Sequence, residues 1–208
     1  MMLTSARNRT VLTLFTTADA VQCHRVRMVL AAKGVVYDRV EARPDKLPED
    51  LSDLNPYGTL PTLVDRDLVL HDTAVMCEYL DERYPHPPLM PIDPLSRARL
   101  RLAMVRIEQD WLPLVDTIGA GGRKAETARK HLREQLLAAR PLFKAAKFFL
   151  NPELSLADCL VVPVIWRLPS LGIKLGREGK VIADYGERIF RSHGFARSLT
   201  DDERAMIE

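Results

Sequence analysis

The N-terminal part of the chain alternates between short runs of β-branched and aliphatic residues and segments with a one-sided hydrophobic stripe. The runs predict strands over residues 11–15, 35–40, 62–64 and 68–70, the last two joined by a tight turn of charged residues. The stripes predict a helix over residues 24–33, which Gly34 would end, and another over residues 73–83. A β-α-β unit followed by β-β-α indicates a small domain in which helices cover a sheet.

A proline-rich segment ends this part of the chain. Residues 84–93 read YPHPPLMPID, and their four prolines exclude both a helix and a central strand. The pattern after this segment is helical, with helices predicted over residues 95–118, 126–139 and 184–193 and an apolar helix through residues 159–166. The predicted domain organisation is a first domain over residues 9–85, a connector over 86–93, a helical domain over 94–200, and flexible tails at 1–8 and 201–208.

Composition and charge exclude several classes of protein. With 47% hydrophobic and 28% charged residues, the chain is neither disordered nor of low complexity, and its net charge of +2 does not indicate a nucleic-acid-binding face. The longest uninterrupted apolar run, residues 159–166, is far shorter than the roughly 20 residues that span a membrane. The 3 cysteines fit neither a disulfide framework nor a zinc site, so we expect a cytoplasmic protein with no metal and no cofactor.

Three local patterns point to a known fold. Residues 55–65 read NPYGTLPTLVD, residues 70–74 read LHDTA, and residues 155–158 read SLAD before the apolar helix. In this order and spacing they resemble the glutathione transferase fold, in which a thioredoxin-like N-terminal domain of the α/β class precedes an all-helical C-terminal domain. The resemblance covers nearly the whole chain.

The resemblance also implies a ligand pocket in the first domain. Pro61 would be the family's cis proline, which lets the backbone of Leu60 bind a peptide-like ligand. Asp72 and Thr73 would stand where a Glu-Ser pair of the family holds the glutamyl end of glutathione, at a helix N-terminus that favours a carboxylate. Taken from the residues alone, Asp72 is equally an ordinary helix N-cap that follows a turn.

The position of the family's catalytic residue is changed in this chain. Residues 20–27 read AVQCHRVR, whereas members that use serine or cysteine begin this pattern with that residue. Ala20 has a methyl group, which neither donates a hydrogen bond nor attacks a substrate, so we expect no transferase activity. Two alternatives stay open: the hydroxyl of Thr16 or Thr17, or the thiol of Cys23 at a helix N-terminus, serves a glutathione-dependent transferase or thiol transferase. Cys23 is otherwise a buried, inert thiol.

A closer resemblance is to one branch of this fold that is not enzymatic. Residues 79–91, YLDERYPHPPLMP, resemble the signature of the stringent starvation protein A family, and residues 106–111, 128–134 and 166–173 agree with it. The resemblance implies a homodimer that binds RNA polymerase holoenzyme, core and sigma factor, during starvation and stress, without transferase activity. Pro85, His86 and Pro87 would then be the partner-binding residues.

The proline segment and the basic residues of the helical domain each allow two interpretations. The prolines around His86 either set the angle between the domains or stiffen a docking loop, because a rigid loop loses little entropy on binding. The basic residues on the helices after residue 94 either form solvated faces or contact an acidic surface of the polymerase, with at most a weak DNA contact.

Overall fold

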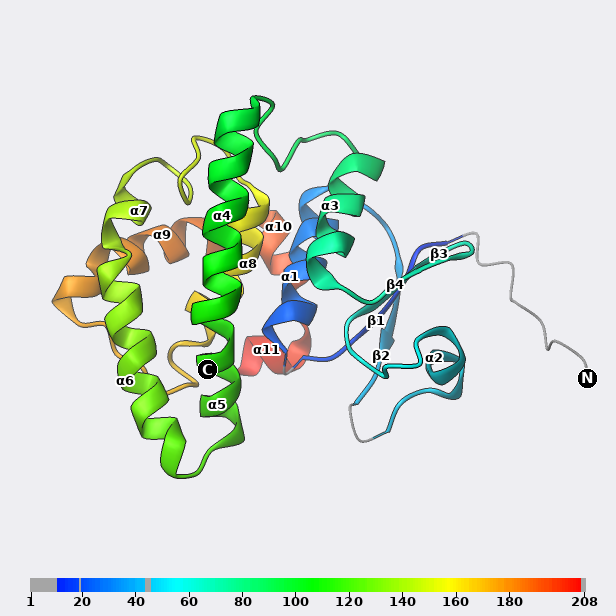
Figure 1. The fold of residues 1–208 in the computed structure, drawn as a ribbon, viewed down its shortest axis with the longest axis horizontal. Coiled ribbons are helices and arrows are strands. Elements are labelled where there is room, and N and C mark those ends of the chain that lie inside the picture. The colour runs from blue at the N-terminus through cyan, green and yellow to red at the C-terminus, as the bar shows by residue number, and fades with distance from the viewer. Residues whose placement is uncertain (1–10, 19, 44–45, 207–208) are drawn as a thin grey trace, which may run out of the picture.

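The computed structural model describes residues 11–206 except 19, 44 and 45, and it divides into a sheet with its helices and a larger helical part (Figure 1). The first part contains, in chain order, β1 (Thr13–Thr16), α1 (Val21–Ala32), β2 (Asp38–Glu41), α2 (Glu49–Leu54), β3 (Thr62–Asp65), β4 (Leu68–Leu70) and α3 (Thr73–Arg83). The strand order is β2-β1-β3-β4, with β1 and β2 parallel and the other pairs antiparallel. This is the thioredoxin-like arrangement that the sequence predicts.

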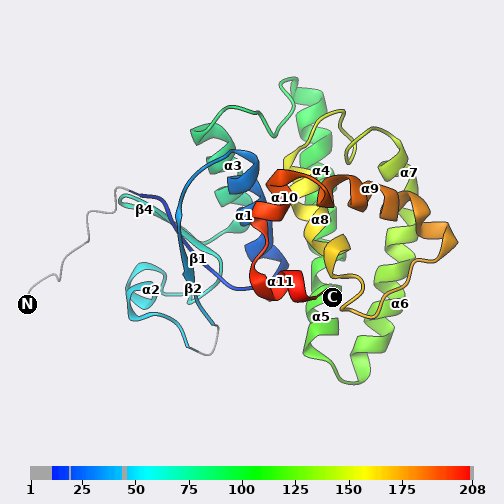
Figure 2. The same cartoon turned by 180° about the vertical axis from the view of Figure 1, so that it is seen from behind.

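The central strand β1 is buried on both faces of the sheet. Because neighbouring side chains of a strand point to opposite faces, Leu14 packs into the large core shared with the helical part, whereas Phe15 packs with Leu51 and Val64. Helices α1 and α3 cover the first face and α2 covers the second, as both views of the fold show (Figures 1 and 2).

The end of α1 explains why the second strand begins later than predicted. Gly34 has a φ of 64°, its amide bonds to the carbonyl of Ala31, and the amide of Val35 bonds to the carbonyl of Leu30. These two bonds close the helix as a Schellman motif, so Val35 belongs to the cap and the strand starts only at Asp38. The start of α1 also differs from the prediction, since the helix begins at Val21 rather than at residue 24.

The helical part contains α4 (Pro94–Asp110), α5 (Leu112–Ala120), α6 (Arg123–Ala138), α7 (Arg140–Lys144), α8 (Leu156–Arg167), a 3-10 helix (Arg177–Gly179), α9 (Lys180–Phe190), α10 (His193–Ser198) and α11 (Asp201–Ala205). The single helix predicted over residues 95–118 is divided at Trp111, because Pro113 lacks the amide that would continue the hydrogen-bond ladder. No helix of the described residues is long and apolar enough to cross a lipid bilayer.

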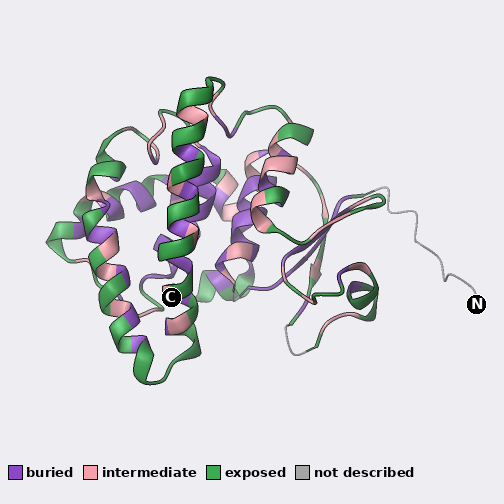
Figure 3. Cartoon of the chain, in the orientation of Figure 1, coloured by how far each residue is buried: buried purple, intermediate pink, exposed green. Residues whose placement is uncertain are grey.

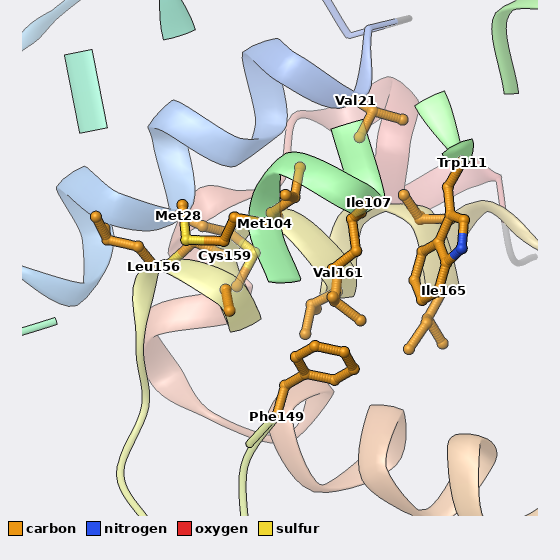
Figure 4. Close-up of a cluster of buried hydrophobic side chains, with 14 of the residues drawn as sticks. Val21, Met28, Met104, Ile107, Trp111, Phe149, Leu156, Cys159, Val161 and Ile165 are labelled. Carbon is orange, nitrogen blue, oxygen red and sulfur yellow. The ribbon is translucent and has the colours of Figure 1, made fainter. Parts of the chain in front are cut away.

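One hydrophobic core runs through both parts. Helix α8 lies at its centre, and Figure 3 shows buried positions over almost its whole length. Side chains of α1, α4 and α8 converge there, among them Met28, Met104 and Cys159 (Figure 4). The first part is therefore packed directly on the helical part through α1.

The C-terminal segment corrects a prediction. A flexible tail is predicted over residues 201–208, but residues 201–205 form α11, whose Glu203 is completely buried. Thr200 and Glu203 cap this helix through reciprocal hydrogen bonds. The tail predicted at 1–8, and residues 207 and 208, lie outside the described residues.

Candidate functional site

The predicted partner-binding residues lie on an exposed loop between α3 and α4. Pro85, His86, Pro87 and Pro88 are all exposed, and we call these four residues the Pro-His-Pro loop. The next residue, Leu89, is buried in the common core together with Met90. The loop thus presents an imidazole and three proline rings to solvent, directly before two residues that are buried in the core.

Two charged side chains, those of Lys33 and Asp81, hold the backbone of this loop and of the residue after it. The ammonium Nζ of Lys33, at the C-terminal end of α1, donates to Asp81 Oδ1 at 2.6 Å and to the carbonyl oxygen of Pro87 at 2.5 Å. The same Asp81 oxygen accepts the amide of Leu89 at 2.8 Å. The side chain of Lys33 is 0% exposed and that of Asp81 is 11% exposed, so this arrangement, the Lys33–Asp81 clamp, is shielded from water.

The far side of the loop is tied to the helical part. The carbonyl of Leu89 accepts the amide of Leu156, the first residue of α8, at 2.9 Å. The first amides of a helix have no partner within it, so this bond satisfies both groups. Both backbone polar groups of Leu89 are therefore engaged, one by Asp81 and one by α8.

Sequence reasoning missed Lys33 and Asp81, although a signal for Lys33 exists. Lys33 continues the buried spacing of Val26, Val29 and Leu30 on α1, and a charge on an apolar stripe requires a partner. The partner is 48 residues away in the chain, and no local pattern identifies it.

The residues of the predicted glutathione pocket take up the expected local geometry. The Leu60–Pro61 peptide bond is cis, which confirms that prediction. Asp72 caps α3, since its Oδ1 accepts the amide of Val75 at 2.9 Å, and Thr73 is the first residue of the helix. Because the Asp72 carboxylate already lies at the N-terminus of α3, a ligand carboxylate there would meet a like charge.

The residues at the start of α1 offer little reactive chemistry. Ala20 is the N-cap residue of α1 and offers only a methyl group. The Cys23 thiol is completely buried, and this burial raises its pKa despite the lowering effect of Thr17, Thr16 and Arg27 nearby. The thiol therefore stays protonated and out of reach, which agrees with a buried inert cysteine and not with a reactive thiolate. The Thr16 hydroxyl is also buried and accepts from Arg27 at 2.5 Å.

A buried cluster of charges joins α1, α8 and α11, with His24 in the first turn of α1 and Arg27 near the middle of the helix. Arg27 Nη2 lies 2.6 Å from Glu203 Oε1, and Arg167 pairs with the same oxygen. His24 Nε2 lies 3.0 Å from the Ser198 hydroxyl. Burial, together with Arg167 and Arg27, holds the pKa of His24 well below its usual value, so the imidazole is neutral. These groups bond to one another, and we infer that the cluster stabilises the packing of the first part of the chain on the helical part.

Comparison with known proteins assigns the family. Residues 21–83 match the glutathione S-transferase N-terminal domain, and residues 102–192 match the glutathione S-transferase C-terminal domain. The stringent starvation protein A homolog of Haemophilus influenzae is 48% identical to the chain over 200 residues, which cover 95% of the chain and 94% of that relative. The chain belongs to the stringent starvation protein A family.

Other similarities agree with this family and with the fold. The stringent starvation protein A homolog of Pasteurella multocida is 46% identical over the same shares of the two chains. A rice glutathione transferase in complex with glutathione superimposes with a TM-score of 0.84, covering 95% of this chain and 93% of the rice protein. The superposition shows that the chain shares the fold of this transferase. At 19% sequence identity, it shows nothing about the activity of the chain.

Proposed function

We propose that this member of the stringent starvation protein A family is a cytoplasmic transcription regulator that binds RNA polymerase holoenzyme, core and sigma factor, during starvation and stress. The observation that carries the proposal is the exposed Pro-His-Pro loop, held on the Lys33–Asp81 clamp, in a chain that aligns with its named relatives over 95% of its length. Pro85, His86 and Pro87 are the residues that we assign to this contact.

The geometry of the loop suits recognition of another protein. Proline rings have few conformations to lose, and the clamp fixes the backbone beneath them, so binding costs little ordering entropy. The His86 imidazole adds a hydrogen-bonding group to an otherwise apolar surface.

We infer further that the protein has no transferase activity. The support is Ala20 at the start of α1, whose methyl group cannot donate a hydrogen bond to a bound glutathione thiol, and the inward position of Cys23. Glutathione-dependent chemistry through Cys23 is disfavoured by the same burial.

The proposed active form is a homodimer. Leu95, Leu102 and Val105 lie on one side of α4, at spacings of two and three turns, and are 61%, 64% and 43% exposed. An unpaired apolar face of this kind is typical of an interface between subunits.

Binding of the purified protein to RNA polymerase holoenzyme tests the proposal. We expect micromolar or tighter binding by the wild type and a loss on the order of tenfold or more for His86→Ala, as for an anchor residue of an interface. His131→Ala, which removes another exposed imidazole on α6, is the matched control and should bind like the wild type. Absence of binding at low salt by a wild type whose circular dichroism spectrum shows a folded helical protein would refute the proposal.

A further inference from the structure

We propose that Lys33 and Asp81 are positioning residues for partner binding: the clamp sets the conformation in which the Pro-His-Pro loop is recognised. This inference rests on the proposed function, because it assigns a role in the contact with the polymerase to residues that do not themselves touch it.

The clamp links three separate segments at one point. Lys33 ends α1, Asp81 lies in the last turns of α3, and the bonded groups of the connector are the Pro87 carbonyl and the Leu89 amide. Pro87 is the residue directly after His86, which carries the imidazole. Fixing the Pro87 carbonyl therefore fixes the direction in which His86 leaves the surface.

Burial does not hold the loop by itself. The four residues of the Pro-His-Pro loop are exposed, so they gain little from packing, and the nearest buried side chain is that of Leu89. Without the clamp, the contacts of the segment from Arg83 to Leu89 would lie near its two ends, where the Tyr84 side chain packs against the core and Leu89 is buried. The Lys33 ammonium is the group that bonds to its interior.

Stability alone gives no reason for an ion pair at this place. A buried pair must overcome the desolvation of both charges, and an apolar pair of the same volume often serves stability equally well. The ion pair adds directional hydrogen bonds to the connector. The bond to the Pro87 carbonyl at 2.5 Å and the bond from the Leu89 amide at 2.8 Å are satisfied together in one arrangement of this segment.

The test uses Lys33→Met, which keeps the length and apolar stem of the side chain and removes the ammonium. We expect the dissociation constant for RNA polymerase holoenzyme to rise on the order of tenfold, because the loop must then be ordered at the moment of binding. Hydrogen exchange at the Leu89 amide should become faster, since its acceptor Asp81 loses its partner. Lys180→Met, which removes an exposed lysine paired with Asp184 on α9, is the control and should change neither quantity.

A double variant separates positioning from a general structural role. If Lys33 acts through the loop, then Lys33→Met combined with His86→Ala should weaken binding by less than the product of the two single fold-changes. Independent losses that add would overturn the inference. Should Lys33→Met fail to fold, Lys33→Met combined with Asp81→Asn replaces it. The double change removes the ammonium bond to Pro87 and leaves no unpaired charge, while the asparagine oxygen still accepts the Leu89 amide.

The outcomes also distinguish this inference from the proposed function. If the wild type binds, His86→Ala binds weakly and folded Lys33→Met binds like the wild type, only the positioning role is wrong. If the wild type does not bind, the proposed function fails and the positioning role fails with it.

Discussion

Replacing Glu203 by glutamine tests whether α11 locks the two parts of the chain together. The carboxylate lies 2.6 Å from Arg27 and also pairs with Arg167, and the side chains of the three residues are at most 4% exposed. Glutamine has nearly the same shape but no charge, so the variant leaves two guanidinium groups buried without their anion. The same change weakens the capping box with Thr200.

The expected cost follows from these contacts. Removing one partner of a buried ion pair typically destabilises a protein by about 3 to 5 kcal/mol, because the remaining charge stays desolvated. Loss of part of a helix cap adds up to about 1 kcal/mol. Against a total free energy of unfolding of about 5 to 15 kcal/mol for an ordinary protein, this is a large fraction.

Urea unfolding followed by tryptophan fluorescence measures the effect. The indole Nε1 of Trp166 donates to the Glu203 carbonyl at 3.0 Å, so the probe reports directly on the docking of α11. The control is Glu126→Gln, since Glu126 is 86% exposed beside Arg129 and such surface pairs contribute about 0 to 1 kcal/mol. A free energy of unfolding for Glu203→Gln within about 1 kcal/mol of the wild type would refute the reasoning.

Three further predictions concern His24, the cysteines and α4. Because the folded state lowers the pKa of His24, stability should fall as the pH drops through the unfolded value of 6.5, and His24→Gln should flatten this dependence in unfolding measured from pH 8 to 5. Burial raises the pKa of Cys77 to about 11 and also that of Cys23, so native protein should resist alkylation and urea-unfolded protein should react fully, as read by mass spectrometry. Leu102→Glu should shift a dimer to monomer in sedimentation, whereas Lys180→Glu should not.

Those features that depend on neighbours in the sequence were predictable. The Asp72 cap and the capping box of Ser155 and Asp158 each involve residues three positions apart, and the structure contains both. The proline segment likewise reveals itself by composition, and residues 84–93 contain neither helix nor strand. The physical reason is that a cap or a proline acts on its own turn, whatever the rest of the fold does.

The two buried ionic arrangements could not be predicted in the same way. Arg27 and Glu203 are 176 residues apart in the chain. The charged composition around Glu203 is typical of a solvated tail, and nothing in the local sequence indicates that this segment packs against α1. Asp81 lies among other charged residues of α3, and only the fold shows that Lys33 reaches it. A long-range ion pair leaves no periodic pattern, because its two partners lie in different helices that are far apart in the sequence.

The surroundings of the two ends of α1 differ in a way that supports the proposed role in partner binding. At the N-terminal end, Thr16, Cys23 and His24 are buried, and their neighbours are Arg27, Arg167 and Ser198 of the chain itself. At the other end, about 18 Å away along a twelve-residue helix, Lys33 supports an exposed imidazole. The exposed imidazole of His86 therefore lies next to the C-terminal end of α1, at the position that we propose for contact with a macromolecular partner.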